Sequence, residues 1–411
     1  MRIGIYEDGH CHDLQPLIRL MPVFNLRCGI LRIREKTELR LSSYPVDLYV
    51  RKKLLAVMQE QEPDRKINIF IPDDYLFINS RLLAKNEFYN KVHSLPKDSV
   101  LMVNEQPAAY RLQKSSLSNL AFNEEGLLVF PPLSTLRVIR NENPEDVMIR
   151  YAWDLITNNS AQIAEDFRLS PGMGFCEGQL YEGAYLLHPE HIYIARNTNI
   201  YPGVVISAAD GPVYIGSEVT ILPGSFLQGP LYIGDQTLVK AGSKIYGGTS
   251  IGPVCKVGGE IEGSILHSYS NKQHEGFLGH ACLGQWVNLG ADTNNSDLKN
   301  NYGKIRSYAN GKEIDTGLRF LGLIMGDHCK SGINTMFNTG TVAGMMCNIF
   351  GSGFPPKYLP DFTWGGEQER IPYAIDKALE TAKTVMLRRK QTLGPALESL
   401  IRLWYSDLVK D

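Results

Sequence analysis

Apolar residues recur at every sixth position through the middle of this chain. The longest unbroken run of this repeat consists of Ile215, Ile221, Leu227, Ile233, Val239, Ile245, Ile251 and Val257. The ordinary strands of a sandwich would rarely keep so many positions in phase by chance. A six-residue repeat instead predicts a parallel β-helix, in which each hexad is a short strand plus a turn and points one apolar residue inward. Hexad solenoids coil left-handed, against the usual preference for right-handed crossovers.

The chain also has a second, longer period of 18 residues. Glycine follows the apolar residue at Gly216, Gly234 and Gly252, which are 18 apart, so three hexads make one coil. Glycine suits the corners between strands because it tolerates a positive φ at little cost. The rhythm breaks after residue 257, returns later, and is interrupted by a long polar excursion over 293–321. A loop of that length inside a compact domain is either functional or disordered.

The first 170 residues have a different pattern, in which short apolar strands alternate with helical segments. This alternation predicts an α/β, Rossmann-like domain over 1–170. We expect a linker over 171–187, the β-helix over 188–366 and a helical segment over 367–411. The expected strands cover 2–6, 66–71, 75–79 and 99–103, and the expected helices cover 26–40, 84–93, 146–169, 371–390 and 395–409.

Charge and composition exclude several classes of partner. The 42 basic and 44 acidic residues give a formal net charge of −2, which implies no general attraction to nucleic acid or to an anionic membrane. We expect neither a signal peptide nor a membrane-spanning segment. The seven cysteines are odd in number and lack CxxC spacing, which favours reduced thiols in a cytoplasmic protein.

A more specific pattern lies where the six-residue rhythm breaks and returns. The segment from His274 to Gly303 reads HEGFLGHACLGQWVNLGADTNNSDLKNNYG. Its histidine, the leucine-glycine pair at 278–279 and the asparagine-leucine-glycine-alanine run at 288–291 follow a known order and spacing. That order is found in the acetyltransferase half of the bifunctional N-acetylglucosamine-1-phosphate uridyltransferase/glucosamine-1-phosphate acetyltransferase family. With its α/β half first and its solenoid second, the chain resembles a divergent branch of these hexapeptide-repeat acyltransferases.

The resemblance implies acetyl transfer from acetyl-CoA to the amine of an amino-sugar phosphate or a nucleotide-linked amino sugar. His274 would be the general base, because a neutral imidazole near pH 7 can accept the amine proton. The backbone of Ala291 would contact the CoA arm. The residues implied for the sugar substrate are Lys272, Asn288, Asn301 and Tyr302. Phe277 replaces a tyrosine of the family, and no upstream basic residue clearly matches those that hold the sugar phosphate.

The N-terminal half departs further from the family. Nucleotidyltransferases follow their first strand with a Gly-rich loop whose backbone amides cradle phosphates. Here the loop Glu7–Cys11 has one glycine and two acids, and it would repel a triphosphate. Asn79 stands where the family has an aspartate that holds magnesium, and a neutral amide is a poorer ligand for that cation. We expect nucleotidyl transfer to be weak, altered or lost, although Arg27, Arg34 and Lys36 are candidates for phosphate contacts.

Two other functions remain open from the sequence. The chain could be a sugar-nucleotide-binding scaffold or sensor without turnover, which the altered N-terminal loop favours. It could also be a metalloenzyme, because some hexad solenoids bind zinc through histidines, and His274, His280 and His328 are available. We expect a homotrimer, because solenoid acyltransferases pack three prisms side by side and the 293–321 excursion is long enough to reach a neighbouring subunit.

Overall fold

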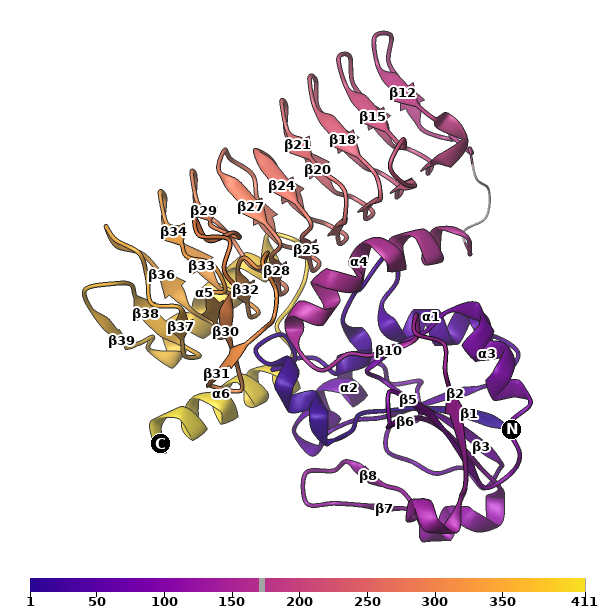
Figure 1. Cartoon of the computed structure of the whole chain (residues 1–411). Coiled ribbons are helices and arrows are strands. Elements are labelled where there is room, and N and C mark those ends of the chain that lie inside the picture. The colour runs from indigo at the N-terminus through magenta and orange to yellow at the C-terminus, as the bar shows by residue number, and fades with distance from the viewer. Residues whose placement is uncertain (170–173, 411) are drawn as a thin grey trace.

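The computed structural model describes residues 1–169 and 174–410. Figure 1 shows an α/β domain at the N-terminal end, a long stack of coils, and two C-terminal helices beside both of them. The α/β domain contains the helices α1 (Ile33–Arg40), α2 (Leu55–Gln61), α3 (Asn86–His93) and α4 (Ala152–Phe167). The C-terminal helices are α5 (Ile375–Leu387) and α6 (Pro395–Lys410). No helix within the described ranges has the length and apolar character that a membrane crossing requires.

The N-terminal domain is built on a mixed sheet of six strands. Their spatial order is β2 (Val46–Tyr49), β1 (Arg2–Tyr6), β3 (Tyr75–Asn79), β6 (Gln106–Leu112), β5 (Ser99–Val103) and β9 (Arg137–Asn141). β6 runs antiparallel to its neighbours β3 and β5, and the other pairs are parallel. Two short antiparallel pairs accompany it: β4 (Leu82–Leu83) with β10 (Val147–Met148), and the hairpin β7 (Ala121–Phe122) with β8 (Leu128–Val129). The strand expected over 66–71 was wrong, because that stretch makes only an isolated bridge.

The solenoid is a left-handed parallel β-helix with three sheets, as the repeat predicts. Sheet one contains β11 (Gln179–Leu180), β14 (Asn199–Ile200), β17 (Thr220–Ile221), β20 (Leu238–Val239), β23 (Lys256–Val257) and β26 (Asn271–Lys272). Sheet two contains β12 (Tyr185–Leu187), β15 (Val205–Ser207), β18 (Phe226–Gln228), β21 (Lys244–Ile245), β24 (Glu260–Glu262) and β27 (Phe277–Gly279). Sheet three contains β13 (Ile192–Ile194), β16 (Val213–Ile215), β19 (Leu231–Ile233), β22 (Thr249–Ile251), β25 (Ile265–Leu266), β28 (Cys282–Leu283), β32 (Ile324–Met325), β35 (Val342–Ala343) and β37 (Tyr358–Leu359).

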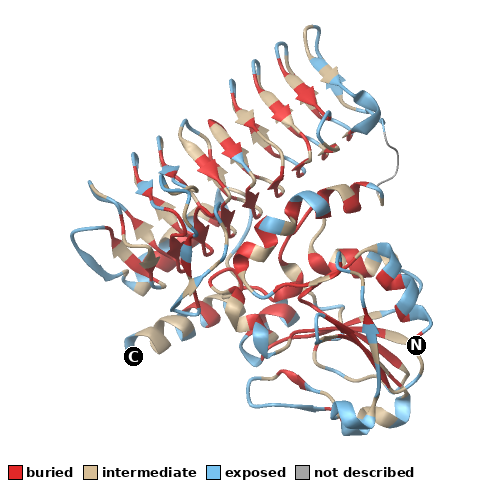
Figure 2. Ribbon diagram, viewed as in Figure 1, coloured by how far each residue is buried: buried red, intermediate tan, exposed pale blue. Residues whose placement is uncertain are grey.

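The last coils continue the first two sheets after an interruption. Sheet one resumes as β33 (Lys330–Ser331), β36 (Asn348–Ile349), β38 (Thr363–Gly365) and β39 (Arg370–Pro372), and sheet two as β29 (Asn294–Asn295) and β34 (Met336–Phe337). All eight residues of the unbroken hexad run are fully buried in one core. Figure 2 shows buried segments, in red, recurring along the stack of coils. The inward positions were therefore predicted correctly, because each hexad sets its own inward residue locally.

The glycines of the repeat act in two different ways. Gly224 and Gly242 have φ values of +72° and +69°, so they form left-handed corners. Gly234 has no positive φ, and a Cβ there would lie 2.5 Å from the Pro253 nitrogen of the next coil. That glycine is required by the close approach of neighbouring coils, so the corner explanation was wrong for its set. Two residues after the last glycine of this set, the same corner turns left-handed without glycine, at Val254 (φ +62°).

Several expected boundaries move in the structure. Residues 170–173, at the end of the expected domain and the start of the expected linker, lie outside the described residues. The rest of the expected linker contains β11 and β12, which pair with β14 and β15. The first coil of the solenoid therefore begins inside that linker. The helix expected over 26–40 begins only at Ile33, since Gly29 turns the chain with a φ of +88°. The helices expected over 146–169 and 371–390 are shortened by the strands β10 and β39.

The polar excursion over 293–321 folds back onto its own chain. Its hairpin, β30 (Arg306–Ala309) with β31 (Lys312–Asp315), carries Ile305 and Ala309 into a core shared with Leu17 and Trp153 of the N-terminal domain. The Leu321 amide donates to the Asp297 carbonyl at 2.9 Å and closes the loop. The excursion therefore joins the two domains of one chain through this shared core.

Candidate functional site

His274 lies at an open corner of the prism, between β26 and β27. Helix α4 packs against sheet three, which is the face opposite that corner. The imidazole is exposed to solvent, and no hydrogen bond or ion pair from it is found in the described part of the chain. A single chain therefore leaves the residue that the resemblance implies as base without a group to orient its ring.

Lys272 is not placed to bind a substrate. Its side chain is 2% exposed, and its Nζ donates to the carbonyls of Gly258, His274 and Glu275. Burial lowers the pKa of this ammonium to about 8, although Glu275 and Asp292 act to raise it. The lysine holds the corner at His274, so its ammonium group is not available for the contact with the sugar substrate that the resemblance implies.

The other implied residues are spread along the solenoid. The side-chain oxygen of Asn288 accepts a hydrogen bond, at 3.2 Å, from the side-chain amide of Asn271 on the preceding coil. Ala291 is half-buried, and its backbone oxygen already accepts from the Asn334 amide at 2.8 Å. Asn301 and Tyr302 lie on the exposed excursion, where Tyr302 is 68% exposed. Within the described residues of one chain, no side-chain hydrogen bond or ion pair joins any of these four residues to His274.

A histidine-carboxylate pair occupies the next corner of the same coil. Nδ1 of His280 lies 2.7 Å from Oδ2 of Asp297, and the pair is only partly exposed. The bond to Asp297 favours the tautomer with a proton on Nδ1, which leaves Nε2 free to accept one. Nε2 lies beside Gly263, where an added Cβ would be 3.1 Å from it. This arrangement has the base and the orienting carboxylate that proton abstraction requires.

A cavity of about 360 Å³ adjoins this pair, between α4, the solenoid and the excursion. Besides His280 its polar lining comes from Thr157 and Ser160 of α4, Glu262 of β24 and Arg319 of the excursion. The ring of Phe320 lies 5.2 Å from the imidazole and covers one side of it. Asp297 and Arg319 belong to the excursion, so the sequence offered no spacing signal that could have joined them to His280.

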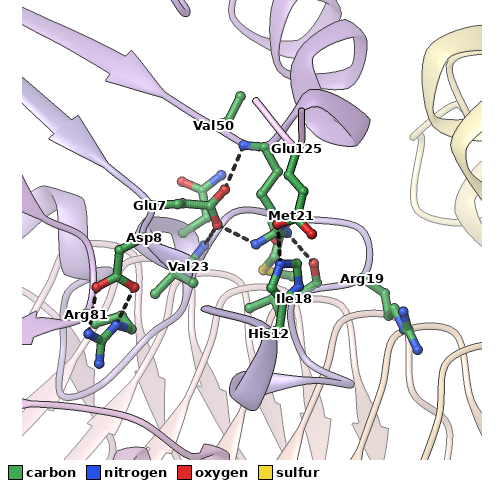
Figure 3. Close-up of polar contacts among 12 residues, drawn as sticks. Glu7, Asp8, His12, Ile18, Arg19, Met21, Val23, Val50, Arg81 and Glu125 are labelled. Carbon is green, nitrogen blue, oxygen red and sulfur yellow. Dashed lines mark hydrogen bonds and ion pairs between the residues drawn. The ribbon is translucent and has the colours of Figure 1, made fainter. Parts of the chain in front are cut away.

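The acidic N-terminal loop is closed by ion pairs rather than open to phosphates (Figure 3). Glu7 is buried and accepts from the Arg51 guanidinium at 2.6 Å and from the Val23 amide at 2.9 Å. Asp8 accepts from Arg81 at 2.7 and 2.6 Å. Burial acts to raise the pKa of Asp8, but the Arg81 guanidinium outweighs it and holds the pKa below its usual value. The two acids thus neutralise buried arginines and fix the loop.

The residues present do not fit a magnesium site. Asn79 is buried, and its side-chain amide donates to Asp8 at 2.8 Å and to the Pro107 carbonyl at 3.2 Å. Its Oδ1 accepts from the Arg81 amide at 3.0 Å, so neither end of the side chain is available to a cation. Of the candidates for phosphate contact, Lys36 is buried against Asp166 at 2.5 Å. Lys36 is therefore a structural residue of the α4 contact.

The three histidines proposed as metal ligands do not converge. His274 follows sheet one, His280 follows sheet two and His328 follows sheet three, so each occupies a different corner. His328 instead stacks on Trp286 with ring centroids 6.0 Å apart. No group of three or more histidine, cysteine or acidic side chains arranged to hold a metal occurs among residues 1–169 and 174–410. These three histidines therefore form no metal site within the described part of one chain.

The N-terminal part of the chain is similar to a known family. Residues 3–171 match the family model described as sugar nucleotidyl transferase. A bifunctional sugar-1-phosphate nucleotidylyltransferase/acetyltransferase of Sulfurisphaera tokodaii is 29% identical over 91 residues, which are 22% of this chain and 23% of that protein. The bifunctional protein GlmU of Methanocaldococcus jannaschii is 29% identical over 90 residues, 22% of each chain. Each match thus spans less than a quarter of the relative's length.

Solved structures of acyltransferases align with the chain at lower identity. The UDP-N-acetylglucosamine acyltransferase from Campylobacter jejuni is 11% identical, and the alignment covers 55% of this chain and 95% of that one with a TM-score of 0.25. The Arabidopsis enzyme of the same name is 11% identical, and the alignment covers 52% of this chain and 78% of that one with a TM-score of 0.23. The parallel pairing of successive coils described above establishes the β-helix. Residues 3–171 thus match a sugar nucleotidyl transferase family model, and 22% of the chain is similar to bifunctional nucleotidyltransferase/acetyltransferases.

Proposed function

We propose that the solenoid transfers an acetyl group from acetyl-CoA to the amine of an amino-sugar phosphate or a nucleotide-linked amino sugar. The observation that carries this proposal is the His280–Asp297 pair at the edge of a polar cavity. The domain order and the relatives' bifunctional names support the same class of reaction. The N-terminal domain is proposed to bind or position sugar nucleotide without ordinary magnesium-dependent turnover.

The reaction requires a general base and groups that stabilise the oxyanion. Nε2 of His280 would accept the proton of the amine as its nitrogen attacks the thioester carbonyl. The Asp297 carboxylate would stabilise the imidazolium that forms, and backbone N–H groups would stabilise the tetrahedral oxyanion. Collapse forms the amide and breaks the carbon–sulfur bond, and the imidazolium returns its proton to the leaving thiolate. The products are an acetamido sugar and free CoA.

His274 remains the alternative base, on the strength of the resemblance. It faces an open corner, so its site would need residues from a neighbouring subunit, such as those around Ala291 or Asn301 of a second copy. A homotrimer is proposed on this ground and on the general preference of such oligomers for closed symmetry. The two bases thus imply different sites: His280 works within one chain, whereas His274 requires the oligomer.

The test is thiol release from acetyl-CoA with a panel of amino-sugar phosphates and UDP-amino sugars. Loss of a general base costs roughly a hundred- to ten-thousand-fold in rate. We expect that loss for His280→Ala, and a smaller loss for Asp297→Asn, which keeps the size of the side chain but removes the charge. His274→Ala is the matched control on the same coil, and the proposal expects it to retain most activity.

The outcomes separate the two sites and the function itself. Near-normal turnover in His280→Ala with a large loss in His274→Ala would move the base to the open corner, and light scattering should then show an oligomer. No thiol release from any acceptor by the wild-type chain, with sugar nucleotide still bound, would favour the scaffold or sensor function instead.

A further inference from the structure

The cavity beside His280 is built from both domains of the chain. One wall is helix α4, which belongs to the N-terminal domain and contributes Ile156, Thr157 and Ser160. The other walls are the solenoid corner with His280 and the end of the excursion. A molecule that binds in this cavity therefore touches the N-terminal domain as well as the solenoid.

The floor of the cavity between α4 and His280 carries no side chains. Gly248 and Gly263 occupy the same corner on successive coils, and a Cβ at Gly248 would lie 3.4 Å from the Gly263 Cα. The same Cβ would lie 2.8 Å from Oγ of Ser160. A Cβ at Gly263 would lie 3.1 Å from Nε2 of His280. The hydroxyl and the base thus flank one short backbone floor, which side chains at these two corners would crowd.

Ser160 carries the hydroxyl of α4 that remains available to a ligand. The Thr157 hydroxyl donates to the Asp154 carbonyl of its own helix at 3.2 Å. The Ser160 side chain is exposed, and within the ranges that the structure describes it makes no hydrogen bond. A helical serine that does not bond back to the preceding turn directs its hydroxyl outward, and here outward is the cavity floor.

The neighbouring residue fixes the position of this hydroxyl. Nδ2 of Asn159 donates to the Gly248 carbonyl at 2.7 Å, and its Oδ1 accepts from the Gly29 amide at 2.7 Å. Because Asn159 is fully buried, helix α4 cannot slide along the corner without leaving buried polar groups unpaired. Ser160 is thereby held over Gly248 before a ligand arrives, and such preorganisation strengthens a binding contact.

The charges around the cavity do not select a ligand on their own. Glu262 and Arg319 line it with opposite signs, so the side chains of the walls favour neither an anion nor a cation. Neutral hydrogen bonds must therefore contribute to selection. A ligand whose amine meets Nε2 of His280 extends across the glycine floor toward Ser160.

We propose that Ser160 of the N-terminal domain binds the acceptor of the acyl transfer, through a hydrogen bond to a hydroxyl group beside the reacting amine. This inference rests on the proposed function and assigns part of the acceptor site to helix α4. The solenoid holds the base, and the N-terminal domain positions the molecule on which that base acts. The acceptor is then bound at the domain junction rather than by the solenoid alone.

Steady-state kinetics of the full chain test this contact. The acceptors are glucosamine 1-phosphate, glucosamine 6-phosphate and UDP-glucosamine, each assayed with acetyl-CoA. Loss of one neutral hydrogen bond weakens binding about two- to tenfold, so Ser160→Ala should raise the acceptor KM by that factor and leave the acetyl-CoA KM unchanged. Ser160→Thr keeps the hydroxyl and should retain the wild-type value. Asn158→Ala is the matched control on the same helix, because Asn158 does not line the cavity.

A deoxy acceptor separates this contact from a change in the fold. The analogue that lacks the contacted hydroxyl should bind worse than its parent to the wild type, and no worse than its parent to Ser160→Ala. Alanine is the better helix former at an exposed position, so the variant should remain folded. An acceptor KM equal to that of the wild type, or a raised acetyl-CoA KM instead, would overturn the inference and leave the acyl transfer standing.

Titration calorimetry without acetyl-CoA measures acceptor binding in the absence of turnover. Weaker binding after Ser160→Ala, combined with no thiol release by the wild type, would support the binding contact and refute the acyl transfer. Equal binding by Ser160→Ala and the wild type would overturn the contact. Absence of binding by all three acceptors would overturn both the contact and the proposed function.

Discussion

Asn159 of α4 is the polar residue that joins three parts of the chain. It is fully buried, and its Oδ1 accepts from the Gly29 amide at 2.7 Å. Its Nδ2 donates to the Gly248 carbonyl at 2.7 Å on the solenoid. The Ser250 hydroxyl lies 3.1 Å from the same Oδ1. One side chain thus connects the N-terminal turn, helix α4 and the β-helix.

Asn159→Ala should destabilise the junction strongly. The substitution leaves one buried N–H and one buried C=O without partners, and each such group costs about 1–3 kcal/mol. We therefore expect a loss of about 2–6 kcal/mol, measured by urea unfolding followed by circular dichroism. Asn158→Ala is the control, because that partly exposed neighbour donates to the Asp154 carbonyl of its own helix.

The control should change stability by no more than about 0.5 kcal/mol. A second signature is expected in the shape of the transition, since loosening the junction should separate the unfolding of the α/β domain from that of the solenoid. If Asn159→Ala were as stable as Asn158→Ala, water would have to replace the side chain, and the junction would not depend on this network.

Two further predictions concern other buried groups. The pKa of Lys272 is lowered from 10.5 to about 8 in the fold, so its contribution to stability increases as the pH rises from about 8 to about 10.5. Lys272→Met should remove about 3 kcal/mol of that increase, measured by urea unfolding across this pH range, and an unchanged pH profile would contradict the burial argument. Asn79→Asp should place a second carboxylate beside Asp8 and lower stability without producing magnesium-dependent pyrophosphate release from UTP and N-acetylglucosamine 1-phosphate. Pyrophosphate release by the wild type or the variant would refute the conclusion that this site does not hold magnesium.

The sequence predicted the solenoid well because its rule is local. Each hexad places its inward residue independently, so the eight buried positions followed from spacing alone. The first coil was missed for a specific reason. Leu180 and Leu186 keep the six-residue step, but a short 3-10 helix at Pro189–His191 shifts the phase before Ile194. An insertion at a corner hides a coil from a search for a fixed period.

The site was less predictable because it depends on contacts distant in sequence. His280 gains its carboxylate only because the excursion folds back and brings Asp297 beside it. Lys272 looked like a substrate ligand, and only the structure shows that three carbonyls occupy its ammonium group. Asn159 lies on a helix whose pattern predicts burial but not which polar partners it meets. Side-chain pairing across domains has no periodic signal in a single sequence.

The most direct test of the central claim is the identity of the product. The wild-type chain would be incubated with acetyl-CoA and each amino-sugar phosphate or UDP-amino sugar, and the sugar analysed by nuclear magnetic resonance and mass spectrometry. We predict a new acetamide on the sugar amine, formed in equal amount with free thiol and depleted in His280→Ala. Thiol release without an acetylated sugar, or an unmodified sugar with every acceptor, would contradict the account.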